Sequence, residues 1–244
     1  MDSGYYAACA AFRSQSQALE LIANNLANAN SAGYRSQRTS FRSLLASKSP
    51  LILSALNQAV NNFNVVGASQ TNLSSGNMVT TGNPFDLAIE GNGFFVLQNQ
   101  SGTFYTKNGE FHVSRSGELV TSDGDAVMGE QGPLKVPQGT ASISSDGTLS
   151  VGGAVAGKLR VVEFAPGSPL VSAGKARYTA EANSALPAAR SYVRQGMIES
   201  SNVNPIAETM SLITAQRQAE MMQRAMSVFY GEFNRIAASE LPRV

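Results

Sequence analysis

Residues 5–29 read YYAACAAFRSQSQALELIANNLANA. Eight positions here are spaced alternately three and four residues apart, and all but the fourth are apolar: Tyr5, Ala8, Phe12, Gln15, Leu19, Ile22, Leu26 and Ala29. This is the period of a coiled-coil seam. Asp2 or Ser3 can cap the start of the helix, and Gly33 is placed to end it in the left-handed conformation. The sequence therefore predicts an N-terminal helix about 40 Å long with one apolar stripe.

The tail of the chain repeats this spacing with larger side chains. Asn204-Pro205 reads as an N-cap followed by proline at the first helical position, and Pro242 lies just past the expected end. One such stripe alone would fit an ordinary helix facing the core of a globular domain. Two matched stripes, one at each end of the chain, favour a coiled-coil pairing of the two ends or a bundle with other copies.

We define the assembly seam as a set of thirteen apolar positions taken from these two stripes. It consists of Tyr5, Phe12, Leu19, Ile22 and Leu26 in the head, and of Leu212, Ala215, Ala219, Met222, Met226, Phe229, Phe233 and Ile236 in the tail.

The middle of the chain reads as β structure. Nineteen of the 22 glycines lie between Gly67 and Gly196, and glycine disfavours helix interiors but suits tight turns. From Phe85 to Glu181 short apolar runs alternate with turn signals, which are Gly91-Asn92-Gly93, Asn108-Gly109, Ser116-Gly117, Asp123-Gly124, Asp146-Gly147 and Gly152-Gly153. We predict a largely antiparallel β domain built of hairpins.

The segment between Lys48 and Asp86 contains no charged residue and has seven asparagines. It fits either a solvent-exposed linker or an extended segment that packs against neighbouring subunits. The expected fold class is α+β. Residues 1–48 and 197–244 would form one helical domain, residues 49–84 a charge-free extended linker, and residues 85–196 the β-rich central domain.

Composition excludes several classes of function. Eighteen Lys and Arg against 17 Asp and Glu leave a net charge of +1, which gives no basis for nucleic-acid binding. Cys9 is the only cysteine and His112 the only histidine, so we expect neither an internal disulfide nor a thiolate or imidazole metal cluster. The apolar runs fall far short of the ~20 residues that a membrane helix needs. We therefore expect no membrane span, and we expect no secretory signal peptide.

The motifs that could carry chemistry fail on spacing. Gly91-Asn92-Gly93 lacks the third glycine of a dinucleotide fingerprint, because the required position is Val96. Three acidic residues between positions 123 and 130 do not have the spacing of an EF-hand, and a hairpin turn explains Asp123-Gly124 better. His112 lies in an alternating strand without a recognisable nucleophile motif nearby. The sequence thus predicts no enzymatic activity, no cofactor, no metal and no small-molecule substrate.

Several short motifs follow one another along the chain. Near the start are Asn24, Asn25, Leu26, Ala27 and Asn28, followed by Gly33 and Tyr34. The middle contains GNPFDLAIEGNGFF at residues 82–95, YTKNG at 105–109 and GELVT at 117–121. Before the tail lies ESSNVNP at residues 199–205, with Asn202, Val203 and Asn204. Together these motifs resemble those of flagellar basal-body rod and hook proteins. The opening residues and residues 129–137 are most similar to proximal rod proteins.

The resemblance implies a structural subunit of the bacterial flagellar basal-body rod, polymerising axially through its terminal helices as part of the drive shaft for motility. Within the family, both terminal helices pack together at the inside of a tubular rod. The implied partners are other copies, neighbouring axial rod proteins and the type III export apparatus. The implied location is the rod crossing the periplasm, reached without a cleavable signal peptide. A distal rod or hook-type protein and a free-standing β-domain binding module or adhesin remain as alternatives.

Overall fold

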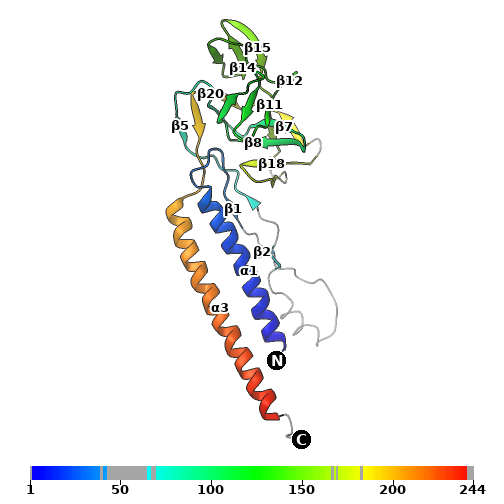
Figure 1. Cartoon of the computed structure of the whole chain (residues 1–244), viewed down its shortest axis with the longest axis vertical. Coiled ribbons are helices and arrows are strands. Elements are labelled where there is room, and N and C mark those ends of the chain that lie inside the picture. Colours follow the sequence, from blue (N-terminus) through cyan, green and yellow to red (C-terminus); the bar gives the residue numbers. More distant parts are fainter. Residues whose placement is uncertain are drawn as a thin grey trace. The chain divides into compact units, whose positions relative to one another are not determined.

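A computed structural model describes residues 2–38, 41–42, 65–66, 70–165, 168, 170–181 and 184–240. It contains two long helices and many short strands (Figure 1). The chain forms two compact units. We name them the helical unit, which contains residues 2–27 and 204–240 with short pieces between 37 and 70, and the β unit, which contains residues 28–36 and 71–203.

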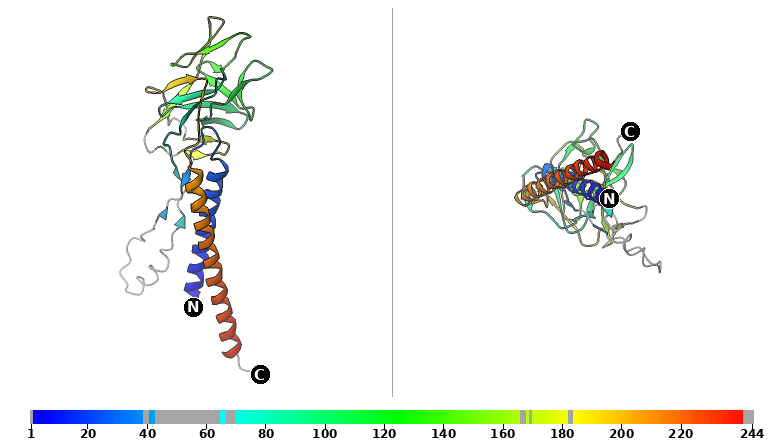
Figure 2. Two further views of the ribbon diagram at one scale, coloured as in Figure 1. Left: turned by 90° about the vertical axis from the view of Figure 1, so that its left-hand side faces the viewer. Right: turned by 90° about the horizontal axis from the view of Figure 1, so that it is seen from below.

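The helical unit is built on α1 (Asp2–Ala27) and α3 (Pro205–Glu240), of 26 and 36 residues. The two helices lie side by side in Figure 1, and they pack against each other. Figure 2 shows them from two further directions. The Gln15 side-chain amide donates hydrogen bonds to the Ala215 carbonyl and to Gln218 Oε1, both at 3.1 Å. Nearer the N-terminus, Cys9 Sγ lies 4.0 Å from Met226 Sδ. From Cys9 to Gln15 along α1, the contacts on α3 move back from Met226 to Gln218 and Ala215. The two helices are therefore antiparallel.

The start of α3 has the predicted cap. Asn204 Oδ1 accepts hydrogen bonds from the backbone N–H groups of Ile206 and Ala207, at 3.1 and 3.2 Å. These two N–H groups lie in the first turn, where no intrahelical carbonyl is available to them. The prediction that Asn204-Pro205 begins the C-terminal helix is confirmed.

The predicted end of α1 at Gly33 is wrong, because the helix ends at Ala27. A turn follows, in which the Ser31 N–H donates to the Asn28 carbonyl at 3.1 Å. Gly33 does have a left-handed backbone, with φ +64°, but it serves a close approach within the β unit. A Cβ atom there would lie 2.1 Å from the backbone nitrogen of Asn108.

The main sheet of the β unit has ten strands. Its strands run in the order β17-β18-β8-β7-β11-β10-β9; β16 pairs with β7 and β19, and β12 pairs with β11, every pair being antiparallel. The bounds are β7 Phe94–Asn99, β8 Gly102–Thr106, β9 Phe111–Val113, β10 Leu119–Thr121, β11 Ala126–Gly129, β12 Gly132–Pro133, β16 Val161–Phe164, β17 Val171–Ser172, β18 Arg177–Thr179 and β19 Ala185–Pro187.

Smaller sheets complete the strand set. A three-stranded sheet contains β13 (Ala141–Ile143), β14 (Thr148–Val151) and β15 (Ala154–Lys158). Two further antiparallel pairs join β6 (Leu87–Glu90) to β20 (Tyr192–Gln195) and β5 (Met78–Thr80) to β21 (Met197–Glu199). The remaining strands are very short: β1 Gln37–Arg38, β2 Phe41–Arg42, β3 Val65–Val66 and β4 Gln70–Thr71.

Strand β7 is buried on both faces, which explains its uninterrupted apolar run. Successive side chains of a strand point to opposite faces. Phe95 and Leu97 belong to one core, which they share with residues such as Leu149, whereas Phe94 and Val96 belong to a second core around Tyr178. The second core is packed edge to face, with the Phe94 ring centroid 6.0 Å from that of Tyr178.

Four of the predicted turn signals join paired neighbouring strands. They are Ser116-Gly117, Asp123-Gly124, Asp146-Gly147 and Gly152-Gly153, and each contains glycine at positive φ. Asn108-Gly109 is not a hairpin turn, because β8 and β9 pair with other strands. Gly109 instead packs so closely on Leu87 that a Cβ atom would lie 1.6 Å from the Leu87 carbonyl oxygen. Gly91-Asn92-Gly93 likewise joins strands that do not pair with each other.

Candidate functional site

The face of α3 toward α1 is a narrow protected stripe. Among the described side chains of α3, those at least partly shielded from solvent are spaced four and three residues apart: Glu208, Leu212, Ala215, Ala219, Met222 and Met226. Ala215 and Ala219 are the most buried of them. Five of these positions belong to the assembly seam. The side chains of Phe229, Phe233 and Ile236 lie outside the described residues.

On α1 the protected region is broader than a stripe. The seam residues Phe12, Leu19, Ile22 and Leu26 are half-buried, but so are most side chains between positions 11 and 22. The Tyr5 side chain lies outside the described residues. The exposed positions of the described helix are Arg13, Glu20, Ala23, Asn24 and Ala27, and we name them the α1 ridge.

Gln15, the polar position in the stripe of α1, makes two hydrogen bonds to α3. A polar residue inside an apolar stripe costs stability but fixes register when it is hydrogen-bonded. Sequence reasoning noted Gln15 as the exception in the stripe and left it out of the seam. Gln15 lies at the three-and-four spacing of the stripe. This spacing was the signal in the sequence that could have assigned it a role between the helices.

The opposite face of α3 presents large apolar side chains to solvent, and sequence reasoning missed it. Ile206, Met210 and Ile213 follow one another at spacings of four and three, with exposures of 75, 66 and 46%. Met221 and Val228 continue the same face at 60 and 63%. At 100° per residue these positions lie almost opposite the protected stripe. We name them the outer face of α3. The signal was present in the sequence as a second apolar repeat, offset from the seam.

A buried ionic cluster lies inside the β unit, where three distant chain segments meet. Arg35 Nη2 and Glu199 Oε1 form an ion pair at 2.8 Å, and both side chains are fully shielded from solvent. Glu199 Oε1 also accepts a hydrogen bond from the Gly76 N–H at 2.8 Å. Its backbone carbonyl accepts one from the Gly33 N–H at 2.7 Å. One residue thus holds the segments around positions 33–35 and 76 to the end of β21.

Asn202 makes a second connection between the same segments. Its Oδ1 accepts a hydrogen bond from the Ser36 N–H at 2.7 Å. Its Nδ2 donates to the carbonyls of Asn72 and Ser74, at 2.9 and 2.8 Å. We name the contacts of Arg35, Glu199 and Asn202 the chain junction. All its residues lie within the β unit.

Lys107 brings an additional positive charge to the junction. Its Nζ lies 3.8 Å from Glu199 Oε2 and donates a hydrogen bond to the Gly91 carbonyl at 2.6 Å. Burial lowers the pKa of Lys107 to about 8, although the Glu199 carboxylate opposes that shift. Burial likewise raises the pKa of Tyr178, whose hydroxyl accepts a hydrogen bond from the Arg35 N–H, to about 12. Buried ionic groups that are held by hydrogen bonds make the surrounding chain rigid and favour a single arrangement of it.

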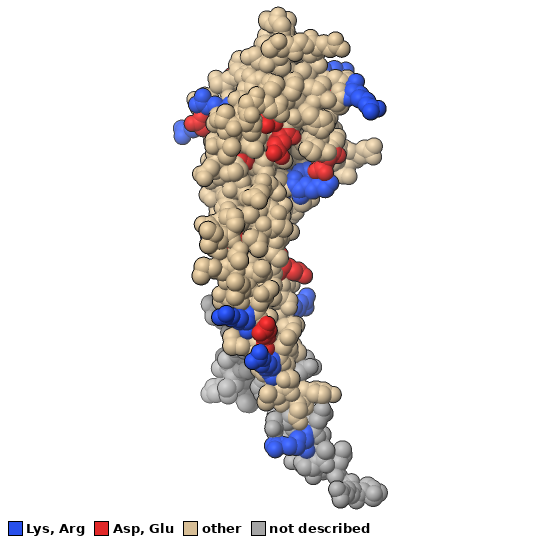
Figure 3. All heavy atoms as spheres, turned by 60° about the vertical axis from the view of Figure 1, so that its left-hand side comes forward, with Lys and Arg blue, Asp and Glu red and all other residues tan. Residues whose placement is uncertain are grey.

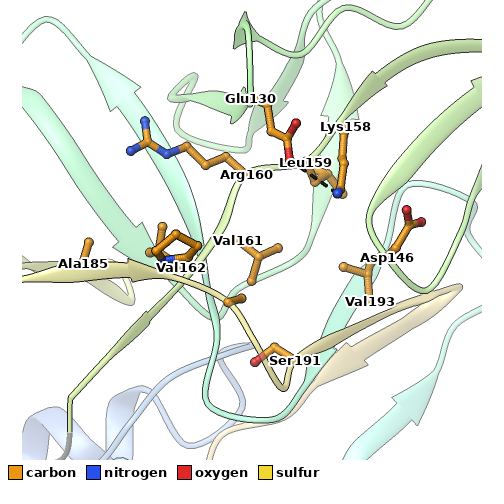
Figure 4. Close-up of a pocket in the computed structure, with 12 residues that line it drawn as sticks. Glu130, Asp146, Lys158, Leu159, Arg160, Val161, Val162, Ala185, Ser191 and Val193 are labelled. Atoms are coloured by element: carbon orange, nitrogen blue, oxygen red, sulfur yellow. Dashed lines mark ion pairs between the residues drawn. The ribbon is translucent and has the colours of Figure 1, made fainter.

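A polar cleft of about 520 Å³ lies on another part of the β unit (Figure 4). Lys158 and Glu130 form an exposed ion pair across 3.4 Å, and the Arg160 side chain extends away from them. The Ser191 hydroxyl donates to Glu163 Oε1 at 2.7 Å and accepts from the Gly93 N–H at 2.8 Å. The bond from Ser191 lowers the pKa of Glu163. The Ser191 hydroxyl therefore connects the loop at residues 91–93 to Glu163 on β16.

The described residues contain no cluster of three or more metal-ligating side chains. His112 is exposed on β9, and Cys9 is half-buried on α1. Neither described helix combines the length and apolarity that a membrane crossing requires. Charged side chains of both signs are sparse on the face in Figure 3, in line with the 14% charged composition.

Three family models match the chain in collinear order. Residues 6–35 match the flagella basal body rod protein model, residues 88–151 the D1 domain of flagellar hook protein FlgE/F/G, and residues 194–229 the C-terminal model of flagellar basal body rod FlgEFG proteins. The chain is 31% identical over 225 residues to the flagellar basal-body rod protein FlgF of Mesorhizobium japonicum, covering 90% of each chain. It is 30% identical to FlgF of Caulobacter vibrioides over the whole of both chains. Its identity to FlgG of Agrobacterium fabrum is 31%, over 86% of this chain and 88% of the relative.

The chain belongs to the flagellar basal-body rod and hook protein family. It is a structural rod subunit and not an enzyme, and it belongs to the flagellar basal body. The resemblance seen in the sequence is thereby confirmed.

Several motif residues of the rod family have a visible structural task in this chain. Asn25 is buried and exchanges two hydrogen bonds of 2.9 Å with the backbone of Gln37. Gly33, Tyr34 and Val203 are buried, and the latter two share a small apolar cluster with Ala176. Asn202 connects the chain junction, as described above. In this chain, these residues therefore hold the segments that follow α1 and precede α3.

Other motif residues have different surroundings. Leu26 and Asn28 are half-buried, whereas Asn24 and Ala27 are exposed on the α1 ridge. Asn204 caps α3. Arg35, Lys107 and Glu199 were quoted within or beside the motifs but were not assigned a role from the sequence. The signal in the sequence that could have pointed to a role for these three residues was a charged residue next to buried motif positions.

Proposed function

We propose that this rod subunit polymerises through its terminal helices, with the assembly seam buried as a coiled coil and the outer face of α3 covered by neighbouring subunits. The observation that carries this proposal is the presence of two apolar stripes on opposite faces of α3. One stripe is shielded by α1, and the other is exposed in the single chain. A helix that is apolar on two faces requires a partner on each.

The physical argument rests on the exposed area. Full burial of one large apolar side chain contributes about 1.5–3 kcal/mol, and the outer face carries five such side chains. Contiguous apolar patches on a soluble protein mark interaction surfaces. A rod subunit supplies the matching partner, because copies joined by heterologous contacts form an open helical assembly.

The remaining parts of the proposal follow from family membership. We place the subunit in the proximal part of the rod, where the rod crosses the periplasm, with other copies and neighbouring axial proteins as its partners. It reaches that place through the type III export apparatus, without cleavage of a signal peptide. Residues 49–84 remain the candidate extended segment, and all but residues 65–66 and 70–84 of it lie outside the described part of the chain.

Isolation of basal bodies tests the function. An epitope-labelled copy that replaces the native protein should copurify with basal bodies and appear by electron microscopy at the proximal rod. Recovery at the distal rod or hook would correct the position. Recovery in the soluble or cell-surface fraction alone would support a free-standing binding module and contradict the rod proposal.

A truncation tests the export route. Removal of residues 2–12, through Phe12, should leave the protein in the cytoplasm, because the head of the chain carries the export information. The full-length protein from purified rods should retain its N-terminal residues after Met1 when its mass is measured. Normal amounts of the truncated form in the periplasm would contradict this part of the proposal.

A further inference from the structure

We propose that Gln15, Arg217 and Arg224 determine which of the two apolar faces of α3 receives α1. This inference rests on the proposed polymerisation through the terminal helices and deepens it, because the choice of face decides which apolar surface is left for neighbouring subunits. Both helices belong to the helical unit, and every contact used in the argument lies within one chain.

The helix α3 offers α1 two apolar faces that differ little in position. The protected stripe and the outer face lie almost opposite each other, so a half turn of α3 about its own axis would exchange them. Corresponding positions on the two faces are only two residues apart, as Ala215 and Ile213 are, which is an axial shift of about 3 Å. Five large apolar side chains lie on the outer face. Apolar area alone therefore does not explain why α1 takes the protected stripe.

Gln15 favours the protected stripe. Its side-chain amide donates hydrogen bonds of 3.1 Å to the Ala215 carbonyl and to Gln218 Oε1. Ala215 and Ala219 are the most buried described side chains of α3. Small residues allow two helices to approach closely, and they leave the backbone carbonyl within reach of the amide. The bonded amide therefore fits this stripe at a level where a larger side chain would cover the backbone.

Arg217 and Arg224 disfavour the outer face. At 100° per residue, both lie within the arc between Ile213 and Met221, and both are exposed in the chain. If α1 covered this arc, the two guanidinium groups would face the stripe of α1, which contains no charged residue. Burial of a charge without a partner is strongly destabilising. Specificity that excludes a competing arrangement in this way commonly accompanies specificity from favourable contacts.

The selection has a consequence for assembly. Because α1 takes the protected stripe, every subunit presents the same outer face to its neighbours. A neighbour that covers Arg217 and Arg224 there has to bring acidic groups to them, since charge-assisted hydrogen bonds are what offset their burial. The stripe of α1 lacks such groups, so the two arginines discriminate between α1 and an acidic partner surface.

Cross-linking within one chain reports which face α1 occupies. Cys9 is the only cysteine, and its Sγ lies 4.0 Å from Met226 Sδ. Met226→Cys therefore places a second thiol on the protected stripe. Val228→Cys places it on the outer face at nearly the same level, where Val228 is exposed. A short bismaleimide joins two thiols that lie close together, and mass spectrometry of the monomeric gel band identifies the linked peptides.

The measurements use the purified full-length chain in a concentrated osmolyte, which favours burial of apolar surface. In the otherwise unaltered chain, the link at position 226 should form about tenfold or more faster than the link at position 228. In the triple variant Gln15→Leu, Arg217→Leu and Arg224→Leu, this ratio should fall to about one or below, because both determinants are gone. Gln15→Leu alone and the arginine pair alone should give intermediate ratios.

A matched control removes two arginines elsewhere. Arg115→Leu together with Arg160→Leu takes two exposed arginines from the β unit and leaves α3 unchanged. This variant should keep the ratio of the unaltered chain. Circular dichroism checks that the helices are formed in every variant.

The outcomes concern this inference and not the rod function, because the purified chain is measured without basal bodies. Equal rates at positions 226 and 228 in the otherwise unaltered chain would overturn the selection of a face. An unchanged ratio in the triple variant would show that Gln15, Arg217 and Arg224 do not determine it. A fall in the ratio that accompanies loss of the helical signal would also count against them, since the helices would then be unpaired.

Discussion

The β unit and the helical unit bury their side chains to very different extents. The larger core of the β unit contains 14 buried hydrophobic residues, and several of these, such as Phe95 and Leu149, are fully shielded. Among the described side chains of α1 and α3, only Asn25, Ala215 and Ala219 are buried. The β unit therefore contains the apolar area that its own fold needs. The helix pair has most of its apolar area still available to other chains.

The difference indicates where stability comes from in each unit. Ordering one residue costs roughly 1–2 kcal/mol of backbone entropy, so a folded segment must bury apolar area to remain ordered. The small alanine side chains at the centre of the seam supply little of it. Within a protein, a helix owes most of its stability to packing of its apolar face against other elements, and an isolated helix is marginal in water. The helical unit should thus depend on assembly, whereas the β unit should not.

Hydrogen exchange in a dilute, verified monomer should show the largest contrast. We expect amides of residues 5–29 to exchange near the rates of an unfolded peptide, because the seam alone gives too little burial. Amides of β7 and β11 should be protected about a thousandfold or more, close to the global stability of the β unit. Mass spectrometry of peptic fragments measures both. Strong protection across residues 5–29 would show that the helix pair is stable without partners.

Met226→Asp should abolish incorporation into the rod while leaving the β unit folded. Met226 is half-buried against Cys9, and an unpaired carboxylate there costs several kcal/mol. Recovery in basal bodies and motility measure the effect, and circular dichroism checks the β unit. Arg224→Asp, two residues away and exposed, is the matched control and should be far milder. Wild-type incorporation of Met226→Asp would mean that this stripe is not a buried seam.

Arg35→Met should destabilise the β unit by about 3–5 kcal/mol, because it leaves the Glu199 carboxylate buried without its guanidinium partner. Arg194→Met provides a control with the same contact length. The pairs Arg35–Glu199 and Arg194–Glu90 both have N–O distances of 2.8 Å, but the second is more than half exposed on both sides. Its loss should cost no more than about 1 kcal/mol. Urea unfolding measures the two, and equal losses would show that burial of the junction is unimportant.

The smallest effect concerns pH. The folded pKa of Lys107, about 8, lies below its ordinary value of 10.5. The unfolded chain therefore binds more protons between these values, so the free energy of unfolding should rise with pH in that window. Between pH 8 and 10 the gain is about 2 kcal/mol. Tyr178 acts in the opposite direction: its raised pKa keeps the folded state protonated, so above pH 10 it lowers the free energy of unfolding as pH increases.

Lys107→Met is the control for this pH dependence. The variant should lose the rise in unfolding free energy between pH 8 and 10, as followed by urea unfolding at closely spaced pH values. A rise of equal size in the variant would assign the effect to other groups.

Local signals predicted much of this fold. The period of three and four placed both helices, the Asn204 side chain marked the start of α3, and glycine after a polar residue or after another glycine marked four of the hairpins. Each of these depends on residues close together in sequence. The family motifs also predicted the membership that the relatives confirm.

The features that sequence reasoning missed depend on distant residues. Gly33 and Gly109 were read as local helix and hairpin signals, but each is required because backbone from elsewhere approaches within the space of a side chain. The partners of Arg35 could not be read from spacing, since Glu199 lies 164 positions away. On α3 a second stripe was present in the sequence, but only the packing against α1 distinguishes the free face from the protected one.

The ion pair between Arg35 and Glu199 has a consequence for the order in which the chain folds. The N-terminal part of the chain is synthesised first. Arg35 therefore has to remain unpaired until Glu199, 164 residues downstream, has been added. Closing so long a loop is slow compared with the formation of hairpins such as β13–β14. The strands can therefore pair early, while the segment around Arg35 completes its docking only after Glu199 has arrived. Folding of the β unit ends where its first and last segments meet.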